Sequence, residues 1–401
     1  MKKPTLFGYG ITTKAIAKKV GGSCTFYDDN VKKPYIDEDK NQILPSSLFD
    51  PNSSELEVTT PSLPPTHPLI NSAKHLLSEY DYFANKMPFS IWISGTNGKT
   101  TTTQMLQHLL EKRGSVAGGN IGTPLAELDP QAPIWILESS SFTLHHTNIA
   151  SPNIYLLLPI TPDHLDWHGT PEQYESDKLK PLLTMKEGEM ALIPKGLTLP
   201  QTNAFVVEYD STQFLENYFE IDSSKIRFKA AFLEDALLAL AVTKTLFDEI
   251  DYEKINNFTL DNHRQEETKD SLGRLWVNDS KATNLDAAIQ AIKTYDDRFI
   301  HLIVGGNDKG ADLTPLFKLM ATKQLHLYTI GANSKKLALL AKKYGVEFTS
   351  SQTLENAINT IATNRNQNDV ALLSPAAASF DQFNSYKHRG EEFFRFVKKI
   401  K

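Results

Sequence analysis

The clearest signal in this chain is the run Ile91-Trp92-Ile93-Ser94-Gly95-Thr96-Asn97-Gly98-Lys99-Thr100-Thr101-Thr102. Its apolar start predicts a buried strand, and the segment from Gln104 to Arg113 predicts a helix that ends at Gly114. A strand, a glycine-rich turn and a helix start surround an anion with backbone N–H groups and the positive end of a helix dipole. Lys99 would reach the β- and γ-phosphates of a nucleoside triphosphate, and the Thr100 hydroxyl would bind Mg²⁺.

The spacing of this loop departs from the usual phosphate-binding pattern, which has a glycine where this chain has Ile93. An alternative interpretation is therefore a glycine-rich turn that carries Lys-Thr by chance. The predicted strand before the loop and the predicted helix after it favour phosphate binding.

Composition limits the class of protein. The chain has 401 residues, which allows two or three domains, and its 40% hydrophobic and 22% charged residues are typical of a globular protein. A net charge of −6 without a basic block argues against a nucleic-acid partner. The single cysteine, Cys24, suits a reducing cytoplasm. We expect neither a signal peptide nor a membrane span, because no apolar run approaches about 20 residues.

Apolar strands alternate with amphipathic helices along the chain, which predicts an α/β fold. We expect a Rossmann-like domain over 1–88, a central P-loop domain over 89–260 and a second Rossmann-like domain over 261–401. In the first domain a helix is expected over 73–83. The glycine turn there, Gly8-x-Gly10, lacks the third glycine of a dinucleotide fingerprint because Thr13 occupies its place.

Polar residues follow several predicted strands at their carboxyl ends, where ligands gather in such sheets. Glu138 ends a strongly apolar strand, which we expect one strand over from the phosphate loop in the sheet, and a carboxylate there suits a Mg²⁺ ligand. The segment 162–169 packs two aspartates and two histidines behind another strand. Three polar loops, 278–284, 305–310 and 374–381, follow strands of the last domain. Lys178 lies two turns into a helix capped by Thr170, and by composition alone it is a solvated lysine.

These motifs occur together, and in this order, in the Mur ligase family, which the chain resembles over nearly its whole length. The segments that carry the resemblance are Gly95-Thr-Asn-Gly-Lys-Thr-Thr101, Glu138-Ser-Ser-Ser-Phe142, Asp163-His164, Asn262-His-Arg-Gln-Glu266, Asn278-Asp-Ser-Lys-Ala-Thr-Asn284 and Leu373-Ser-Pro-Ala-Ala-Ala-Ser379. The last two are most similar to the D-glutamate-adding branch. The resemblance implies an ATP-dependent, ADP-forming ligase that joins D-glutamate to UDP-N-acetylmuramoyl-L-alanine through an acyl phosphate, in cytoplasmic peptidoglycan precursor synthesis.

The resemblance also implies roles for individual residues. The ATP phosphates would be bound by the loop residues Gly95, Thr96, Asn97, Gly98, Lys99, Thr100 and Thr101. Arg264 and Asp279 would contact the base and ribose of ATP. Thr100 and Glu138 would bind one Mg²⁺, and His164 and Lys178 would bind a second. In the family the matching lysine is carbamylated by CO₂, which makes it an anionic ligand. Catalysis would rest on Lys99, Glu138, His164 and Lys178. Substrates would contact Ile11, Thr12, Asn120, Lys281, Thr283, Lys309, Ser379, Phe380 and Tyr386.

The chain departs from the family pattern at Phe232 and Asp235, where asparagines are usual, and at Asp28-Asp29-Asn30, which lacks the usual basic residue. ATP and amino acid would contact different domains, so we expect domain closure, and we expect a monomer. Three alternatives remain open from the sequence. They are a sibling Mur ligase or folylpolyglutamate synthase with another substrate, a P-loop module that binds nucleotide without ligation, and a nicotinamide-dependent oxidoreductase.

Overall fold

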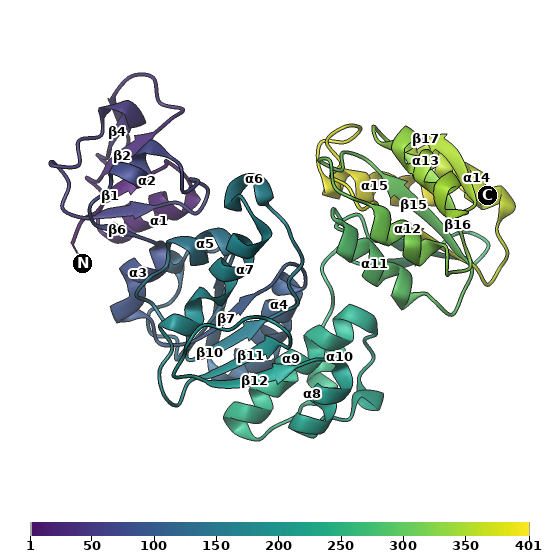
Figure 1. Ribbon diagram of the computed structural model, residues 1–401, viewed down its shortest axis with the longest axis horizontal. Helices are drawn as coiled ribbons and strands as arrows, with labels where there is room; N and C mark the ends of the chain where they lie inside the picture. The colour runs from purple at the N-terminus through teal and green to yellow at the C-terminus, as the bar shows by residue number, and fades with distance from the viewer. Residues whose placement is uncertain (1, 401) are drawn as a thin grey trace. The chain divides into compact units, whose positions relative to one another are not determined.

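The computed structural model describes residues 2–400 and contains three six-stranded sheets (Figure 1). The first sheet has the strand order β3-β4-β2-β1-β5-β6 and is parallel except for the β3–β4 pair. Its elements are β1 (Thr5–Phe7), α1 (Ile11–Lys19), β2 (Thr25–Asp28), β3 (Tyr35–Ile36), β4 (Gln42–Pro45), β5 (Glu57–Thr59), α2 (Pro68–Ser72), β6 (Leu76–Leu77) and α3 (Glu79–Phe83).

The second sheet is fully parallel, with the order β12-β11-β10-β7-β9-β8. Its strands are β7 (Phe89–Ser94), β8 (Ser115–Gly119), β9 (Ile134–Glu138), β10 (Ile154–Leu157), β11 (Met190–Pro194) and β12 (Phe205–Tyr209). Its helices are α4 (Lys99–Leu110), α5 (Ser141–His146), α6 (Leu165–His168), α7 (Pro171–Leu179), α8 (Thr212–Phe219), α9 (Ala230–Phe247) and α10 (Tyr252–Asn257). The phosphate-loop strand β7 therefore lies in the interior of this sheet, between β10 and β9.

The third sheet has the order β13-β14-β18-β15-β16-β17, with only the β13–β14 pair antiparallel. Its strands are β13 (Glu266–Lys269), β14 (Leu275–Asn278), β15 (Ile300–Gly305), β16 (Leu325–Ile330), β17 (Phe348–Gln352) and β18 (Val370–Leu373). Its helices are α11 (Leu285–Thr294), α12 (Thr314–Met320), α13 (Ser334–Tyr344), α14 (Leu354–Asn364) and α15 (Tyr386–Val397).

Alternating side chains of the third sheet fill two separate cores, one on each face. Leu302 on β15 packs in a cluster with residues of α11, α12 and α13, whereas the next residue, Ile303, packs in a cluster with residues of α14 and α15. Successive strand residues point to opposite faces, so helices cover both sides of the sheet. This arrangement is the α/β architecture expected from the sequence, and the predicted fold class is confirmed.

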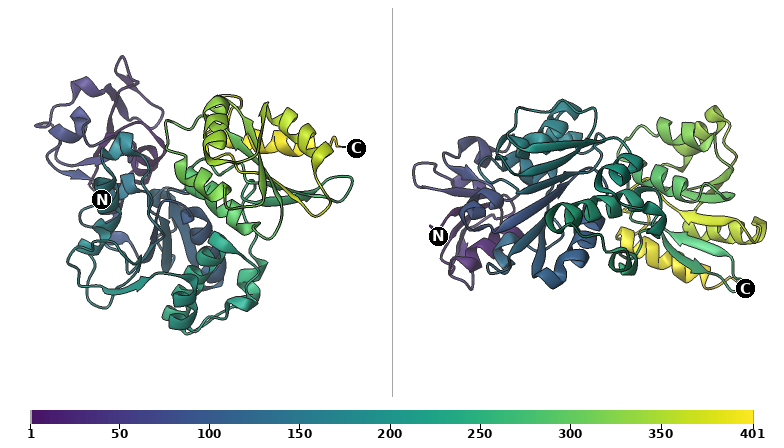
Figure 2. Two further views of the ribbon diagram at one scale, coloured as in Figure 1. Left: turned by 45° about the vertical axis from the view of Figure 1, so that its right-hand side comes forward. Right: turned by 90° about the horizontal axis from the view of Figure 1, so that it is seen from below.

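The chain divides into two compact units. The first extends to Phe258, apart from the short segment Lys229–Ala231, which belongs to the second unit together with the chain from Thr259 onward. The first two sheets belong to the first unit and share one hydrophobic cluster, which contains Phe26 of β2 and Trp92 of β7. Figure 2 shows the strands and covering helices of each sheet from two further directions. The domain boundaries at 88 and 260 stay predictions.

Two expected helices differ from the structure in their bounds. Only Glu79–Phe83 of the helix expected over 73–83 is helical, because Leu76 and Leu77 pair with β5 as strand β6. The phosphate-loop helix also begins earlier than expected, at Lys99. Over residues 2–400, no helix combines the length and apolar character needed to cross a membrane.

Candidate active site

The phosphate loop requires glycine at two positions. Gly95 has φ +141°, and a Cβ there would lie 2.5 Å from Cβ of Leu158. Gly98 is the N-terminal cap of α4 in a left-handed conformation, with φ 84°. Lys99 folds back over this loop, and its Nζ donates to the carbonyl oxygens of Gly95 and Thr96, each at 2.9 Å. The loop therefore has the bend and the cation that a bound phosphate requires.

A buried carboxylate on α9 contacts the phosphate loop and the first turn of α4. Asp235 is buried, with 3% of its surface exposed, and its Oδ1 accepts a hydrogen bond from the Thr102 hydroxyl at 2.9 Å. A Cβ at Gly98 would lie 2.5 Å from the same oxygen. Sequence reasoning noted Asp235 only as a departure from the family pattern, because the contact joins residues 133 positions apart in the chain.

Glu138 lies directly beside the phosphate-loop strand, as the sequence predicted. It ends β9, where it pairs in register with Ile93 of β7. The side chain is 3% exposed, and its Oε1 accepts from Nδ2 of Asn120 at 2.7 Å. Among residues 2–400, its buried Oε2 has no hydrogen-bond partner. A buried carboxylate oxygen without a donor is suited to a cation, so this residue fits the Mg²⁺ expected here.

Lys178 reaches the phosphate loop from α7. It is 1% exposed, and its Nζ donates to the Gly95 carbonyl at 2.8 Å and lies 3.4 Å from Oγ of Ser94. Burial, and then the neighbouring Lys99 cation, hold the pKa of Lys178 well below its usual range. The neutral amine that this favours is nucleophilic, which is the form that reacts with CO₂. The structure therefore gives Lys178 a place at the site that composition did not indicate.

His164 lies at the start of α6, with 45% of its side chain exposed and its Nε2 3.7 Å from Oδ2 of Asp163. Its ring centroid is 4.8 Å from that of Phe142, in an edge-on contact. Over residues 2–400, no three His, Cys, Asp or Glu side chains are grouped to hold a metal ion by themselves. A site with fewer than three such side chains suits Mg²⁺, because this ion usually keeps water and substrate phosphates among its ligands.

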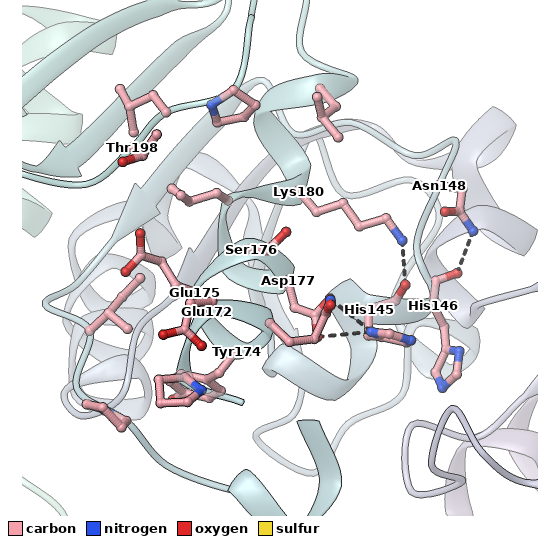
Figure 3. Close-up of a pocket in the computed structure, with 18 of the residues that line it drawn as sticks. His145, His146, Asn148, Glu172, Tyr174, Glu175, Ser176, Asp177, Lys180 and Thr198 are labelled. Atoms are coloured by element: carbon pink, nitrogen blue, oxygen red, sulfur yellow. Dashed lines mark hydrogen bonds and ion pairs between the residues drawn. The ribbon is translucent and has the colours of Figure 1, made fainter. Parts of the chain in front are cut away.

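A pocket of about 950 Å³ runs along α7 (Figure 3). Its walls include His145, Gln173 and Asp177, together with Leu179, Leu183 and Leu199. None of the candidate catalytic residues lines it. In Figure 3 the Asp177 carboxylate points toward His145, and Lys180 donates to the His145 carbonyl.

The polar loops of the second unit gather at one edge of its sheet. They follow β14, β18 and β15, which are neighbours in the strand order. Asn307 and Ala378 form a bridge between the β15 and β18 loops, and a Cβ at Gly306 would lie 2.3 Å from the Ala378 carbonyl oxygen. Nζ of Lys281 lies 4.3 Å from the ring centroid of Tyr386. The sequence correctly predicted that these loops meet.

The remaining candidates in these loops differ in exposure. Ser379 is buried at 2% exposed, Phe380 is 74% exposed, and Lys309 and Thr283 are exposed. Arg264 is half-buried. Asp279 is 6% exposed and accepts from the Ser374 hydroxyl at 2.8 Å, so its carboxylate already has an internal partner.

Sequence reasoning missed Arg389, which ties these loops together. Its guanidinium is 1% exposed and donates to the carbonyls of Ala377 at 3.1 Å and Ser280 at 2.9 Å. Burial lowers the pKa of Arg389 to about 10. Its position in an amphipathic helix gave no signal, because an arginine there is usually solvated.

The N-terminal candidates lie where β1 turns into α1. Ile11, the first residue of α1, is 73% exposed, and Thr12 follows it. The carboxylate of Asp28 at the end of β2 accepts from the Tyr9 backbone N–H at 2.7 Å. Thus the acidic segment at 28–30 supports the glycine turn, where a basic residue was expected from the family.

Two family models match the chain, one described as the Mur ligase middle domain over residues 93–204 and one as the Mur ligase, glutamate ligase domain over 263–377. Together they cover more than half of its length. The chain belongs to the Mur ligase family.

Within that family, two relatives that match over their full length carry the same name. A UDP-N-acetylmuramoylalanine--D-glutamate ligase of Campylobacter jejuni (subsp. jejuni serotype O:23/36, strain 81-176) is 50% identical, across 99% of this chain and 100% of the relative. The Helicobacter pylori (strain HPAG1) protein of the same name is 44% identical, across 99% of this chain and 100% of its own.

Solved structures show the same fold at lower identity. The MurF ligase of Thermotoga maritima in complex with ADP gives a TM-score of 0.60 at 15% identity, covering 100% of this chain and 99% of its own. MurF of Acinetobacter baumannii gives 0.61 at 14% identity, covering 98% of this chain and 89% of its own.

Proposed function

We propose that this chain is the ATP-dependent ligase that adds D-glutamate to UDP-N-acetylmuramoyl-L-alanine, with release of ADP and phosphate, in peptidoglycan precursor synthesis. The full-length similarity at 50% identity to a ligase of that name carries the proposal. The site is consistent with it, because a phosphate loop with Lys99 at its helix start is flanked by the buried side chains of Glu138 and Lys178. The reaction would take place in the cytoplasm.

The reaction has two steps. The terminal carboxylate of the nucleotide-sugar substrate attacks the γ-phosphate of ATP, forms an acyl phosphate and expels ADP. The amine of D-glutamate then attacks the acyl carbon, and the tetrahedral adduct expels phosphate. Negative charge accumulates in both steps, and the phosphate-loop N–H groups and the Lys99 ammonium would stabilise it.

We assign the metal and nucleotide contacts by residue. Thr100 and the unpaired Oε2 of Glu138 would hold one Mg²⁺, and His164 with carbamylated Lys178 would hold a second. When bound, these ions supply positive charge that stabilises the transferred phosphoryl group. Residues Gly95–Thr101 would bind the ATP phosphates, and Arg264 and Asp279 would contact its base and ribose.

Substrate contacts are assigned in the same way. Ile11 and Thr12 would contact the uridine diphosphate, and Asn120 would lie near the reacting carboxylate. Four residues of the second unit would bind and orient the incoming amino acid, namely Lys309, Ser379, Phe380 and Tyr386. Lys281 and Thr283 would also contact substrate. Domain closure and a monomeric state stay predictions. Small-angle scattering, measured with and without an ATP analogue and substrate, tests both.

Oxygen-18 transfer tests the proposed chemistry. UDP-N-acetylmuramoyl-L-alanine labelled with ¹⁸O in its terminal carboxylate is turned over with ATP and D-glutamate, and the released phosphate is analysed by mass. One labelled oxygen should appear in phosphate, because it bridges carbon and phosphorus in the acyl phosphate and leaves with phosphorus. Phosphate without label, released alongside amide product, would exclude activation of the carboxylate by phosphorylation.

A further inference from the structure

Asp177 is a buried carboxylate that the proposed chemistry does not use. It precedes Lys178 on α7 and is 3% exposed. Successive residues of a helix point about 100° apart, so the two side chains face different neighbours. Lys178 contacts the phosphate loop, whereas Asp177 faces α5 and α6. An unpaired carboxylate at this depth would be costly, so its partners matter.

Three donors from three helices hold this carboxylate. Its Oδ1 lies 2.9 Å from Nδ1 of His145 on α5 and accepts from Nε2 of Gln173 on α7 at 2.9 Å. Its Oδ2 lies 2.7 Å from Nδ1 of His168 at the end of α6. With hydrogen-bond partners at both oxygens, the Asp177 carboxylate is held in a single orientation by α5, α6 and its own helix.

His168 extends this contact toward the Glu138 loop. Its Nε2 lies 3.0 Å from the hydroxyl of Ser141, the first residue of α5. Because a carboxylate only accepts, Nδ1 of His168 carries a proton, and in the neutral ring Nε2 accepts from the Ser141 hydroxyl. The chain of hydrogen bonds therefore links α7 to the first residue of α5, which follows Glu138 of β9 by three positions.

Ring contacts connect the same histidine to His164. The Phe142 ring stacks on His168 with centroids 5.4 Å apart and an interplanar angle of 9°. The same Phe142 ring makes the edge-on contact with His164. The contacts of Asp177, His168, Ser141 and Phe142 therefore connect the segments that carry three of the four candidate metal-binding residues, namely Glu138, His164 and Lys178.

We propose that Asp177 and His168 are positioning residues that fix the elements bearing Lys178, His164 and Glu138 relative to one another. The inference rests on the proposed function, since it assigns those three residues to the reaction. Metal and phosphoryl chemistry is sensitive to displacements of about 1 Å, and residues that orient ligands are typically worth about 10- to 100-fold in activity.

A nucleophilic role for the Ser141–His168–Asp177 constellation fits the structure less well. Its spacing is that of a Ser-His-Asp triad, but the Ser141 side chain is buried, with 3% of the residue exposed, and does not line the pocket along α7. A substrate could not reach its hydroxyl. The constellation therefore orients elements and does not attack a substrate.

Replacement of His168 by phenylalanine tests the proposal, because it keeps an aromatic ring but removes both hydrogen bonds. The matched control is His301→Phe in the second unit. His301 is also buried, 3.1 Å from Oδ2 of Asp369 and 3.1 Å from the Tyr328 hydroxyl. The full-length variants are compared by melting temperature, by kcat and KM for ATP, and by the ¹³C NMR signal of a lysine carbamate in labelled bicarbonate.

We expect both variants to melt at lower temperature, because each loses two buried hydrogen bonds. Only His168→Phe should lose about 10- to 100-fold in kcat with KM for ATP changed less than about 3-fold, together with a weaker carbamate signal. Equal kcat and carbamate signal in wild type and His168→Phe would overturn the inference, and so would equal losses in the control. A wild type without ligase activity would instead overturn the proposed function.

If His168→Phe does not fold, His168→Asn and Ser141→Ala give the same answer. The asparagine amide can still donate to Asp177 but cannot reach Ser141, and Ser141→Ala removes the same link from its other end. The two single variants should each lower kcat, and the double variant should lose no more than the worse single one. Additive losses, or no loss, would overturn the inference.

Discussion

Lys178 is the residue on which the proposed chemistry depends most. It is a buried lysine of lowered pKa against the Gly95 carbonyl. We predict that Lys178→Ala and Lys178→Arg both lose at least about 100-fold in kcat, because neither side chain can form a carbamate. Phosphate release from ATP with both substrates is the measurement. Retained activity in Lys178→Arg would mean that only the positive charge matters. The exposed Lys195→Ala serves as control.

Glu138 makes a separate prediction about metal dependence. Glu138→Gln keeps the shape and an oxygen for the Asn120 amide, which donates to Oε1 at 2.7 Å, but removes the charge of the unpaired Oε2. We expect half-saturating Mg²⁺ for ATP turnover to rise about 10-fold. Titration of MgCl₂ at fixed ATP measures this, with Glu127→Gln as control. An unchanged Mg²⁺ requirement would remove Glu138 from the metal site.

At the element scale, the turn between β7 and α4 depends on Gly98. An alanine there pays about 1–2 kcal/mol for its left-handed conformation, and its Cβ would lie 2.5 Å from Oδ1 of Asp235. We predict that Gly98→Ala weakens ATP binding by about 10-fold or more, because the phosphate loop must shift to accommodate the new Cβ. Isothermal titration with an ATP analogue measures this.

A matched control separates strain from crowding in this loop. Gly196 also has a positive φ, +97°, but a Cβ there would meet no atom within 4 Å. Gly196→Ala should therefore cost stability without changing ATP affinity. Asp235→Ala in the Gly98→Ala background should restore part of the lost affinity. Equal affinity in Gly98→Ala and wild type would contradict the requirement for glycine.

The same scale shows what the sequence could and could not predict. Strands β7 and β9 and the cap of α7 were predictable, because hydrophobic runs and capping residues are local signals. The Thr170 hydroxyl accepts from the Gln173 N–H at 3.1 Å, as expected. The helix expected over 73–83 was wrong at residues 76 and 77, because their pairing with β5 outweighed a helical sequence pattern. The environments of Lys178 and Asp177 were not predictable, since both depend on residues distant in the chain.

At the scale of the whole molecule, each unit contains a buried carboxyl group whose pKa is raised by folding. Burial raises the pKa of Asp279 to about 7 and that of Glu79 to about 8. Between pH about 4 and 7, native Asp279 holds a proton that the unfolded chain has lost. Stability therefore falls as pH rises through that window and levels off above it.

Asp279→Asn should remove this part of the pH dependence. Relative to wild type, the variant should gain stability between pH 4 and pH 8 by at most about 4 kcal/mol, since one pKa unit corresponds to about 1.4 kcal/mol. Thermal unfolding across that range is the measurement, with the exposed Asp297→Asn as control. If the difference in stability between wild type and Asp279→Asn were the same at every pH in this range, Asp279 would not have a raised pKa in the folded protein.

The choice of amino acid distinguishes the proposed D-glutamate ligase from the other Mur ligases. The purified chain is incubated with ATP, Mg²⁺ and UDP-N-acetylmuramoyl-L-alanine, and ADP release and amide product are measured with D-glutamate, L-glutamate, L-alanine and meso-diaminopimelate in turn. We predict ADP release coupled to product with D-glutamate alone. Product with L-alanine or meso-diaminopimelate but not D-glutamate would contradict the account and point to another Mur ligase activity.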